Sequence, residues 1–183
     1  QASLTLNQYE NLFGEIESPI EIKAALNWLS VWASLDNQIP ELEDIRKAKF
    51  DIMSNLAHKV DSIVNSTHKS NNFIDRLSLS ESLWKCRNIF PEGEEIAQRN
   101  TLSVIKLAEV TNDLLTLSKA NGLYATILTD LGDNQNAISR FEIAINLAKS
   151  IGAIDLSQKW QAEIGELYNK IGNRTSALAY YES

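Results

Sequence analysis

The stretch NGLYATILTDLGDNQNAISRFEIAINLAKSIGA, residues 121–153, is followed by a second copy of its pattern, QAEIGELYNKIGNRTSALAYYES, residues 161–183. Small and aromatic residues return at the same offsets, since Gly132 and Gly172, Ala137 and Ala177, and Phe141 and Tyr181 are separated by one and the same interval. A fixed period of about 40 residues is typical of a helical-repeat array. The sequence therefore predicts a chain built to present a surface.

Helical spacing continues upstream of these two copies. The segment IKLAEVTND, residues 105–113, lies one repeat period before the similar segment INLAKSIGA, residues 145–153, so a third and more diverged copy exists. Apolar residues spaced by three and four predict helices along the whole chain. The predicted helices cover roughly 1–17, 19–35, 40–64, 72–89, 94–110, 114–131, 134–150 and 155–171, and a ninth begins near Arg174.

These patterns predict an all-α fold, a right-handed α-α superhelix of about four helix pairs. We expect one domain over residues 1–183, with the clearest repeats at 114–152 and 153–183 and diverged repeats at 1–113. Each helix pair is too small to bury its own apolar face, so stacking of neighbouring pairs should supply the core.

Charge and hydropathy limit the possible partners. The net charge is −7 and no run of Lys or Arg exceeds the pair Arg46-Lys47, which argues against nucleic acid and anionic membranes because both need clustered positive charge. No apolar run approaches the ~18 residues that span a bilayer, so membrane insertion is not expected. The oligomeric state stays open.

The two ends of the sequence suggest a piece of a longer protein. It begins at Gln1 without a methionine and stops at Ser183 within a helical pattern. The compartment therefore stays open: the cytoplasm is favoured, and secretion is an alternative if a signal peptide has been removed.

Small residues indicate which repeat this is. The helices pair as A and B of successive repeats. Ala125 and Gly165, one repeat period apart, take the place of the small residue on helix A that lets helix B approach closely. Ala137 and Ala177 are the small residues of helix B. Over residues 118–183 this pattern resembles the tetratricopeptide repeat. The resemblance implies a concave face lined by helix A residues, where peptides bind.

A closer resemblance covers most of the chain. The C-terminal pattern is similar to the last repeats before the protease-like domain of cyanobacterial TPR–CHAT proteins. The matching residues are Leu147, Ala148, Ile154, Asp155, Trp160, Gln161, Gly165, Gly172, Ala177 and Tyr181. The resemblance implies a protein-interaction scaffold that regulates or positions an adjacent CHAT-like effector domain. The family's catalytic His and Cys would lie in that following domain, so His58, His68 and Cys86 take no catalytic role from it.

Candidate reactive groups favour structural interpretations. His58 and His68 straddle a predicted helix end and lack the convergent spacing of metal ligands, so we interpret them as surface histidines. Cys86 lies between Lys85 and Arg87, which can activate a thiol, but no base motif accompanies it. We expect no catalytic residue, no cofactor and no metal.

The acidic turn at residues 130–136 superficially resembles a calcium loop, but it lacks the ligand register of an EF-hand. A glycine C-cap at Gly132, followed by an Asp or Asn N-cap, explains it better.

We expect a protein or peptide partner on the concave face. The helix A register places there one tryptophan and a set of polar and charged residues: Glu81, Trp84, Lys85, Lys119, Thr126, Thr129, Asp130, Lys159, Glu166, Asn169 and Lys170. Trp28, Trp32 and Trp160 are expected to pack between helices, and Trp84 is the exception that should face the inner surface.

Two other functions stay open. A receptor for a peptide or small-molecule signal would need a deep pocket with convergent Asn and Arg side chains, and a structural spacer would fill the groove with its own side chains. At the C-terminal end, Ala177, Tyr180 and Tyr181 are expected to form an exposed apolar edge where a further repeat or domain docks.

Overall fold

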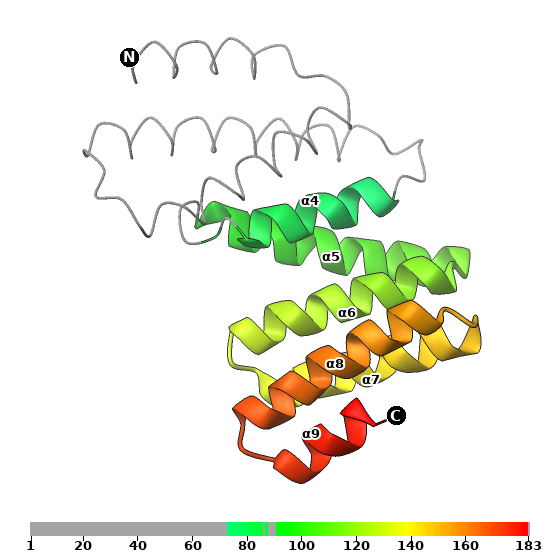
Figure 1. Ribbon diagram of the computed structural model, residues 1–183. Helices are drawn as coiled ribbons and strands as arrows, with labels where there is room; N and C mark the ends of the chain where they lie inside the picture. Colours follow the sequence, from blue (N-terminus) through cyan, green and yellow to red (C-terminus); the bar gives the residue numbers. More distant parts are fainter. Residues whose placement is uncertain (1–72, 86, 88–90, 183) are drawn as a thin grey trace, which may run out of the picture. The chain divides into compact units, whose positions relative to one another are not determined.

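A computed structural model describes residues 73–85, 87 and 91–182. Within them every element is a helix: six helices and no strand (Figure 1). The helices predicted at 1–17, 19–35 and 40–64 lie outside the described residues, as do Trp28, Trp32, His58, His68 and Cys86. The all-α prediction is confirmed for the described part of the chain.

The chain groups into two compact units, Gln1–Ala97 and Gln98–Ser183, which divide within helix α5. No such boundary is visible in the sequence, and the single repeat array that we expected stays a prediction. Each unit is described by itself below.

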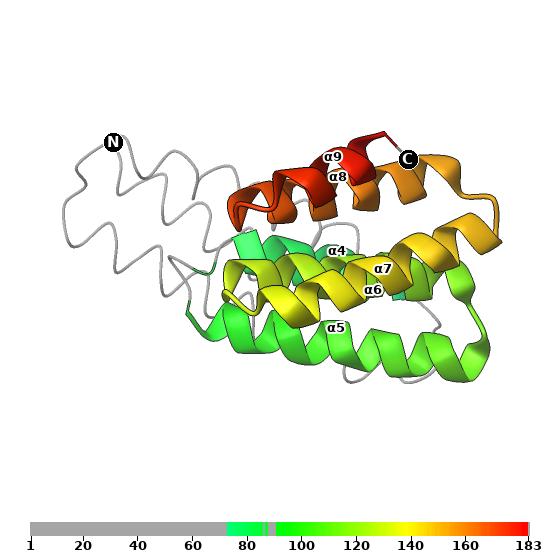
Figure 2. The same cartoon turned by 90° about the horizontal axis from the view of Figure 1, so that it is seen from below.

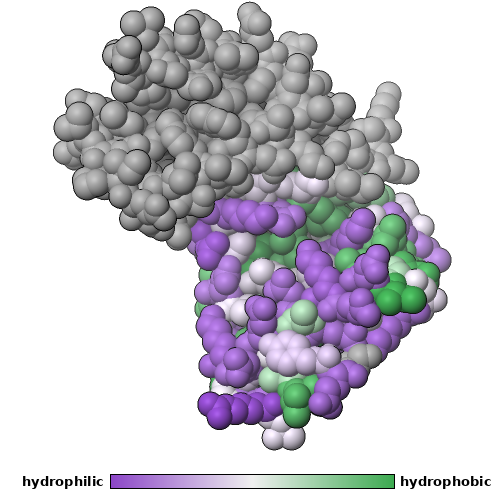
Figure 3. Space-filling model, in the orientation of Figure 1, coloured by the Kyte–Doolittle hydropathy of each residue, from purple (hydrophilic) through white to green (hydrophobic). Residues whose placement is uncertain are grey.

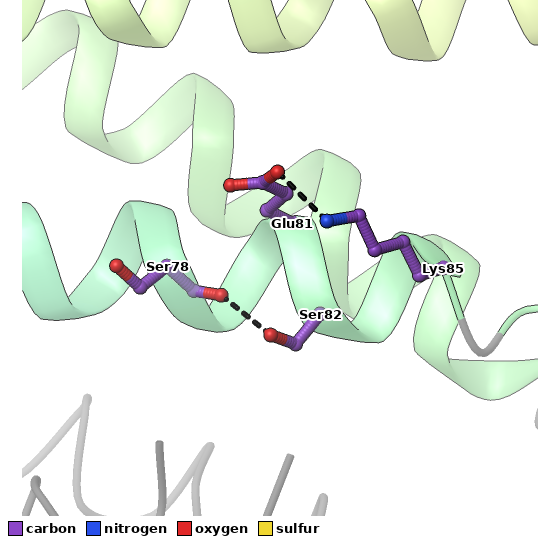
Figure 4. A network of polar contacts seen from close by, with 4 residues as sticks. All are labelled: Ser78, Glu81, Ser82 and Lys85. Atoms are coloured by element: carbon purple, nitrogen blue, oxygen red, sulfur yellow. Dashed lines mark hydrogen bonds and ion pairs between the residues drawn. The ribbon is translucent and has the colours of Figure 1, made fainter. Parts of the chain in front are cut away.

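The first unit contains α4 (Phe73–Lys85) and the beginning of α5 (Glu92–Thr111). On α4 the hydroxyl of Ser82 donates to the carbonyl of Ser78 at 3.0 Å, while the ammonium of Lys85 contacts the carboxylate of Glu81 at 2.9 Å (Figure 4). These bonds span one helical turn, which is the spacing at which side chains of a helix meet. The Glu81–Lys85 pair is exposed, so it contributes at most a few tenths of a kcal/mol.

The second unit holds the rest of α5 and four further helices, α6 (Leu114–Asp130), α7 (Asn134–Ser150), α8 (Ile154–Lys170) and α9 (Arg174–Tyr181). Three-residue turns join α6 to α7, α7 to α8 and α8 to α9, so consecutive helices run antiparallel and pack side by side. Figure 2 shows α9 lying along α8. The helices predicted from residue 114 onward agree with these bounds to within one residue.

The same turn geometry recurs at intervals of half the repeat period. Asn112, Gly132, Gly152 and Gly172 all have positive φ, at 53°, 83°, 69° and 84°. At each turn the amide that follows this residue donates back to a carbonyl five residues earlier, as from Asp133 to Leu128 at 2.9 Å. This is the Schellman arrangement, which satisfies the last carbonyls of a helix and favours glycine because a side chain is strained at positive φ. The prediction of a C-cap at Gly132 is confirmed.

Each turn also starts the next helix. Asp113, Asp133 and Asn173 are N-caps whose side chains accept from the backbone N–H three residues later. Ala153 occupies the same position with no side-chain bond. The bonds from Thr116 hold the pKa of Asp113 below its usual range, since they favour its charged form.

The core of the second unit lies where α6, α7 and α8 meet. Phe141, Ile164 and Leu167 are almost completely buried, and the rings of Phe141 and Trp160 pack with centroids 6.2 Å apart. Gly122 of α6 lies directly against Trp160, so that a Cβ atom there would overlap the indole ring. The expectation that Trp160 packs between helices is confirmed.

The predicted exposed apolar edge at the C-terminal end is confirmed for Tyr181 and corrected for Ala177, and its use as a docking site stays a prediction. Ala177 is buried, and Tyr180 stacks on Tyr168 with ring centroids 5.6 Å apart. Tyr181 is 53% exposed, but one side of its ring covers Gly165. The two tyrosines pack α9 onto α8, Tyr181 over the small residue Gly165 and Tyr180 against the ring of Tyr168.

Candidate interaction groove

A groove of about 430 Å³ lies between α6 and α8, with α7 beneath it. We call it the α6–α8 groove and define it by its lining residues, which are Thr126, Thr129, Asp130, Phe141, Glu163, Glu166, Leu167, Asn169 and Lys170. Hydrophilic side chains predominate over the face of this unit that Figure 3 presents, and the apolar ones gather in small separate groups.

The floor of the groove is apolar. Phe141 reaches it from α7 and Leu167 from α8, with exposed fractions of 1% and 2%. Both belong to the core cluster that also contains Trp160, and the rings of Phe141 and Trp160 pack together, so the floor is part of the close-packed core. Seven of the nine lining residues are polar, so this groove differs from a small-molecule pocket, whose lining is mostly apolar.

The walls repeat one set of positions. Thr126 and Glu166, Thr129 and Asn169, and Asp130 and Lys170 form three pairs whose members each lie one repeat period apart. Because α6 and α8 are separated by one antiparallel helix, they run in the same direction and present equivalent positions to the same groove. All six of these residues were predicted for the concave face, and the fold brings them together.

The polar groups in the groove are mostly hydrogen-bond acceptors. The hydroxyls of Thr126 and Thr129 donate to the carbonyls of Gly122 and Ala125, at 3.2 and 3.0 Å. A hydroxyl has one proton, so each of these oxygens can then only accept a further bond. The three carboxylates of the lining outnumber its single ammonium group, that of Lys170.

Lys159 and Lys119 were also predicted for the concave face, but they are not among the residues that line this groove. The ammonium of Lys159 lies over the indole ring of Trp160, 4.4 Å from its centroid, where the ring's negative face attracts it. Lys119 is half-buried near the carboxylate of Asp113, whose pKa it helps to lower. The sequence register alone does not distinguish these lysines from the residues that line the groove.

Glu81, Trp84 and Lys85 lie on α4 in the other unit. The expectation for Trp84 is corrected, because its side chain is 3% exposed and therefore offers no free aromatic surface. The guanidinium of Arg87 covers its ring at 4.5 Å and donates to its carbonyl at 2.9 Å. Ser80, one helical turn before Trp84, is completely buried as well. The side of α4 that bears Ser80 and Trp84 is therefore a packing surface, while Glu81 and Lys85 are exposed.

A second hollow of about 420 Å³ was not predicted. Its lining comes from α7, α8 and α9 and consists of Glu142, Ile145, Asn146, Lys149, Gln161, Ala179 and Tyr180. The phenol of Tyr180 donates to the carboxylate of Glu142 at 3.1 Å. Burial, and then this bond to a negative group, raise the pKa of Tyr180 to about 12, so the phenol stays protonated.

The register argument also missed three residues of the α6–α8 groove, Phe141, Glu163 and Leu167. The sequence shows an aromatic residue one repeat period after Phe141, at Tyr181. Such a recurrence predicts a core residue, not a residue that lines a groove. Phe141 lines the groove because α7 packs against both α6 and α8. Such a position cannot be read from one helix alone.

In the described part of the chain, no three His, Cys, Asp or Glu side chains gather closely enough to hold a metal ion. The helices described there also include none that is both long and apolar enough to cross a bilayer. Comparison of the chain with protein-family models, with curated proteins and with solved structures finds no match.

Proposed function

We propose that this chain is a non-catalytic interaction module and that the α6–α8 groove binds a segment of a protein or peptide. One observation carries the proposal. Equivalent positions of two parallel helices line one open groove, over an apolar floor that the core supports. Repeat proteins use extended surfaces of this kind for binding, since each repeat adds the same positions to a continuous face.

The finer proposal is a tetratricopeptide-like array that regulates or positions an adjacent CHAT-like effector domain. The identity of the effector rests on the sequence resemblance alone. The repeat type is further supported by the repeated register of the groove walls and by the close approach of α9 to Gly165.

The two alternatives lack comparable support in the described residues. A signal receptor would need free Asn and Arg groups in a deep pocket, but the guanidinium of Arg140 donates to the side-chain oxygen of Asn121 at 2.9 Å. Both groups thereby join α7 to α6. A pure spacer would fill the space between its helices, whereas the α6–α8 groove is open.

Blocking the groove tests the proposal. Asn169→Trp places a large ring in the groove from an exposed position, and Gln158→Trp makes a similar change at an exposed site of α8 outside the lining. Partners captured by the unmodified chain should be lost from the first variant and retained by the second. Equal capture by both variants would show that the groove is not the binding surface.

A further inference from the structure

We propose that the outer side of α9 docks an amphipathic helix of a partner protein, and that this helix carries the same kind of apolar face with which α8 packs on α7. We define the outer side by Leu178 and Tyr181, which are 57% and 53% exposed. No described helix lies on this side of α9 (Figure 1). The surface is separate from the α6–α8 groove, so the inference goes beyond the proposed function.

The preceding repeat shows how the same positions look when a helix covers them. The equivalents of Leu178 and Tyr181 on α7, one repeat period earlier, are Ile138 and Phe141. Phe141 is 1% exposed, and Ile138 is half-buried against the core cluster that α6, α7 and α8 form. Ala177 of α9 is 4% exposed and its equivalent on α7 is completely buried, so the two B helices match at this position. They differ on the outer side.

The exposure is specific to this side of α9. Leu131 and Ile171 are the apolar C-caps of α6 and α8, and they are 46% and 44% exposed. These nearly equal values show that both copies of the repeat place the C-cap in similar surroundings. The large exposure of Leu178 and Tyr181 therefore depends on which helices lie beside α9. In a repeat array, an apolar side that no next helix covers is unfavourable in water.

The interface between α7 and α8 shows what fits this surface. The rings of Phe141 and Trp160 pack with centroids 6.2 Å apart, and Ile164 and Leu167 belong to the same core cluster. These three residues of α8 follow the spacing i, i+4 and i+7, which places them on one face of a helix. Because Tyr181 takes the position of Phe141, the α7–α8 interface continues at α9 with a helix that presents one aromatic and two aliphatic side chains at this spacing.

A second copy of this chain does not supply such a helix from the described residues. Trp160, Ile164 and Leu167 are 4%, 0% and 2% exposed, so α8 of another copy cannot present them without unfolding. Among the described helices, none exposes an aromatic residue together with two aliphatic residues at the required spacing. The occupant is therefore a helix of a partner protein.

A peptide with the sequence of α8, residues 154–170, is the probe. It is acetylated and amidated, and it carries Gly165→Ala, because alanine favours the helix and no α9 covers this residue in the free peptide. A control peptide also carries Trp160→Ser and Ile164→Ser. NMR titration of the labelled chain should show shifts at Leu178 and Tyr181 with the first peptide. The control peptide should bind at least ~10-fold more weakly, because it has lost most of its apolar face.

A matched pair of chain variants locates the surface. Leu178→Glu places a carboxylate in the proposed interface and should weaken binding of the α8 peptide at least ~10-fold, because docking would bury an unpaired charge. Leu131→Glu makes the same change at an exposed C-cap and should leave affinity unchanged. Nuclear Overhauser effects between Tyr181 and Gly165 check that α9 stays packed on α8. Leu178→Gln, which carries no charge, is a second variant that should also weaken binding.

The other outcomes overturn the inference. Equal binding of the two peptides would show that the apolar face of α8 is not what α9 recognises. Shifts that map away from α9, equal losses for Leu178→Glu and Leu131→Glu, or no binding at about 1 mM peptide would show that α9 is not the docking surface. Self-association of the chain that Leu178→Glu abolishes, measured by analytical ultracentrifugation, would make a second copy the occupant. The proposed function is tested separately at the groove by Asn169→Trp.

Discussion

The helix pairs α6–α7 and α8–α9 occupy equivalent positions of the repeat but are held together by different chemistry. Between α6 and α7, the hydroxyl of Ser118 donates to the buried carbonyl of Ala144 at 2.8 Å, and Arg140 binds Asn121. Between α8 and α9, aromatic packing takes this role. The ring of Tyr181 covers Gly165, and Tyr180 stacks on Tyr168.

One repeat position makes the contrast quantitative. Phe141 and Tyr181 are equivalent in the two copies, yet Phe141 is 1% exposed and Tyr181 is 53% exposed. Phe141 lies under both α6 and α8, whereas Tyr181 packs on α8 from one side. Equivalent sequence positions therefore point in equivalent directions, while the helices that cover them decide how much each contributes to stability.

The largest expected effect comes from truncating these two aromatics. Phe141→Ala should lower the free energy of unfolding by about 3–5 kcal/mol, because it leaves a cavity in the core. Tyr181→Ala should cost about 1 kcal/mol or less, since half of its ring is already in water. Urea denaturation followed by circular dichroism measures both. Similar losses for the two variants would contradict the contrast between the pairs.

Filling the two helical glycines gives the next effect. In Gly122→Ala the new methyl group overlaps the ring of Trp160, which is held in the core, so we expect a net loss of about 1–3 kcal/mol. In Gly165→Ala the methyl group meets Tyr181, which can swing outward, and the gain in helix propensity of ~1 kcal/mol should offset the clash. Thermal unfolding of both variants checks this, and a Gly165→Ala loss as large as that of Gly122→Ala would refute it.

The N-cap residues provide a smaller test. Asp133 caps α7 within the first helix pair, and Ala153 precedes α8 in the turn between the two pairs. Asp133→Ala should cost about 1 kcal/mol through the loss of its bond to the amide of Asn136. Ala153→Asp should stabilise the chain by roughly 0.5–1 kcal/mol, because Ala153 already has φ −80° and ψ 73°, close to the −82° and 67° of Asp133. Denaturant midpoints give both values. Ala153→Gln, which lacks a capping side chain, is the control and should gain nothing.

The smallest effect concerns Tyr180, which is the repeat equivalent of Arg140 but turns to Glu142 of α7. Its raised pKa means that the protonated phenol stabilises the fold. This stability is complete below about pH 10, the unfolded value, and is lost as the pH rises through about 12. Absorbance titration near 295 nm should show late-titrating phenols, since burial also raises the pKa of Tyr168. Tyr180→Phe should remove the step near pH 12 and leave the step of Tyr168.

Glu142→Gln refines the same measurement. The late step should move to lower pH but stay above the ordinary value, because burial is the larger cause of the shift and the bond to Glu142 is the second. A step that returns fully to the ordinary value would show that Glu142 alone sets this pKa.

From residue 114 onward the sequence predicted the helix bounds to within one residue, and it predicted most of the groove walls. The helix predicted over 72–89 is shorter in the structure, where α4 ends at Lys85. Helix α7 begins and ends at the predicted residues, because caps at Asp133 and Gly152 act within a few residues of the chain. The register also selected Thr126, Thr129 and Asp130 on α6, with their equivalents on α8. Periodicity determines which face of a helix a residue occupies, and this face is fixed locally.

Only the tertiary structure decided what covers each face. Lys159 follows the same helical register as the groove residues, but its ammonium group lies over the ring of Trp160. Trp84 was expected on the inner surface, but it is buried and the guanidinium of Arg87 covers its ring. Gly122 bears no side chain that could mark it in a hydropathy pattern, yet it determines how closely Trp160 approaches α6. Each of these outcomes depends on how side chains and helices pack together. The physical reason is that backbone geometry sets the direction of a side chain, whereas burial depends on neighbours that the local sequence does not contain.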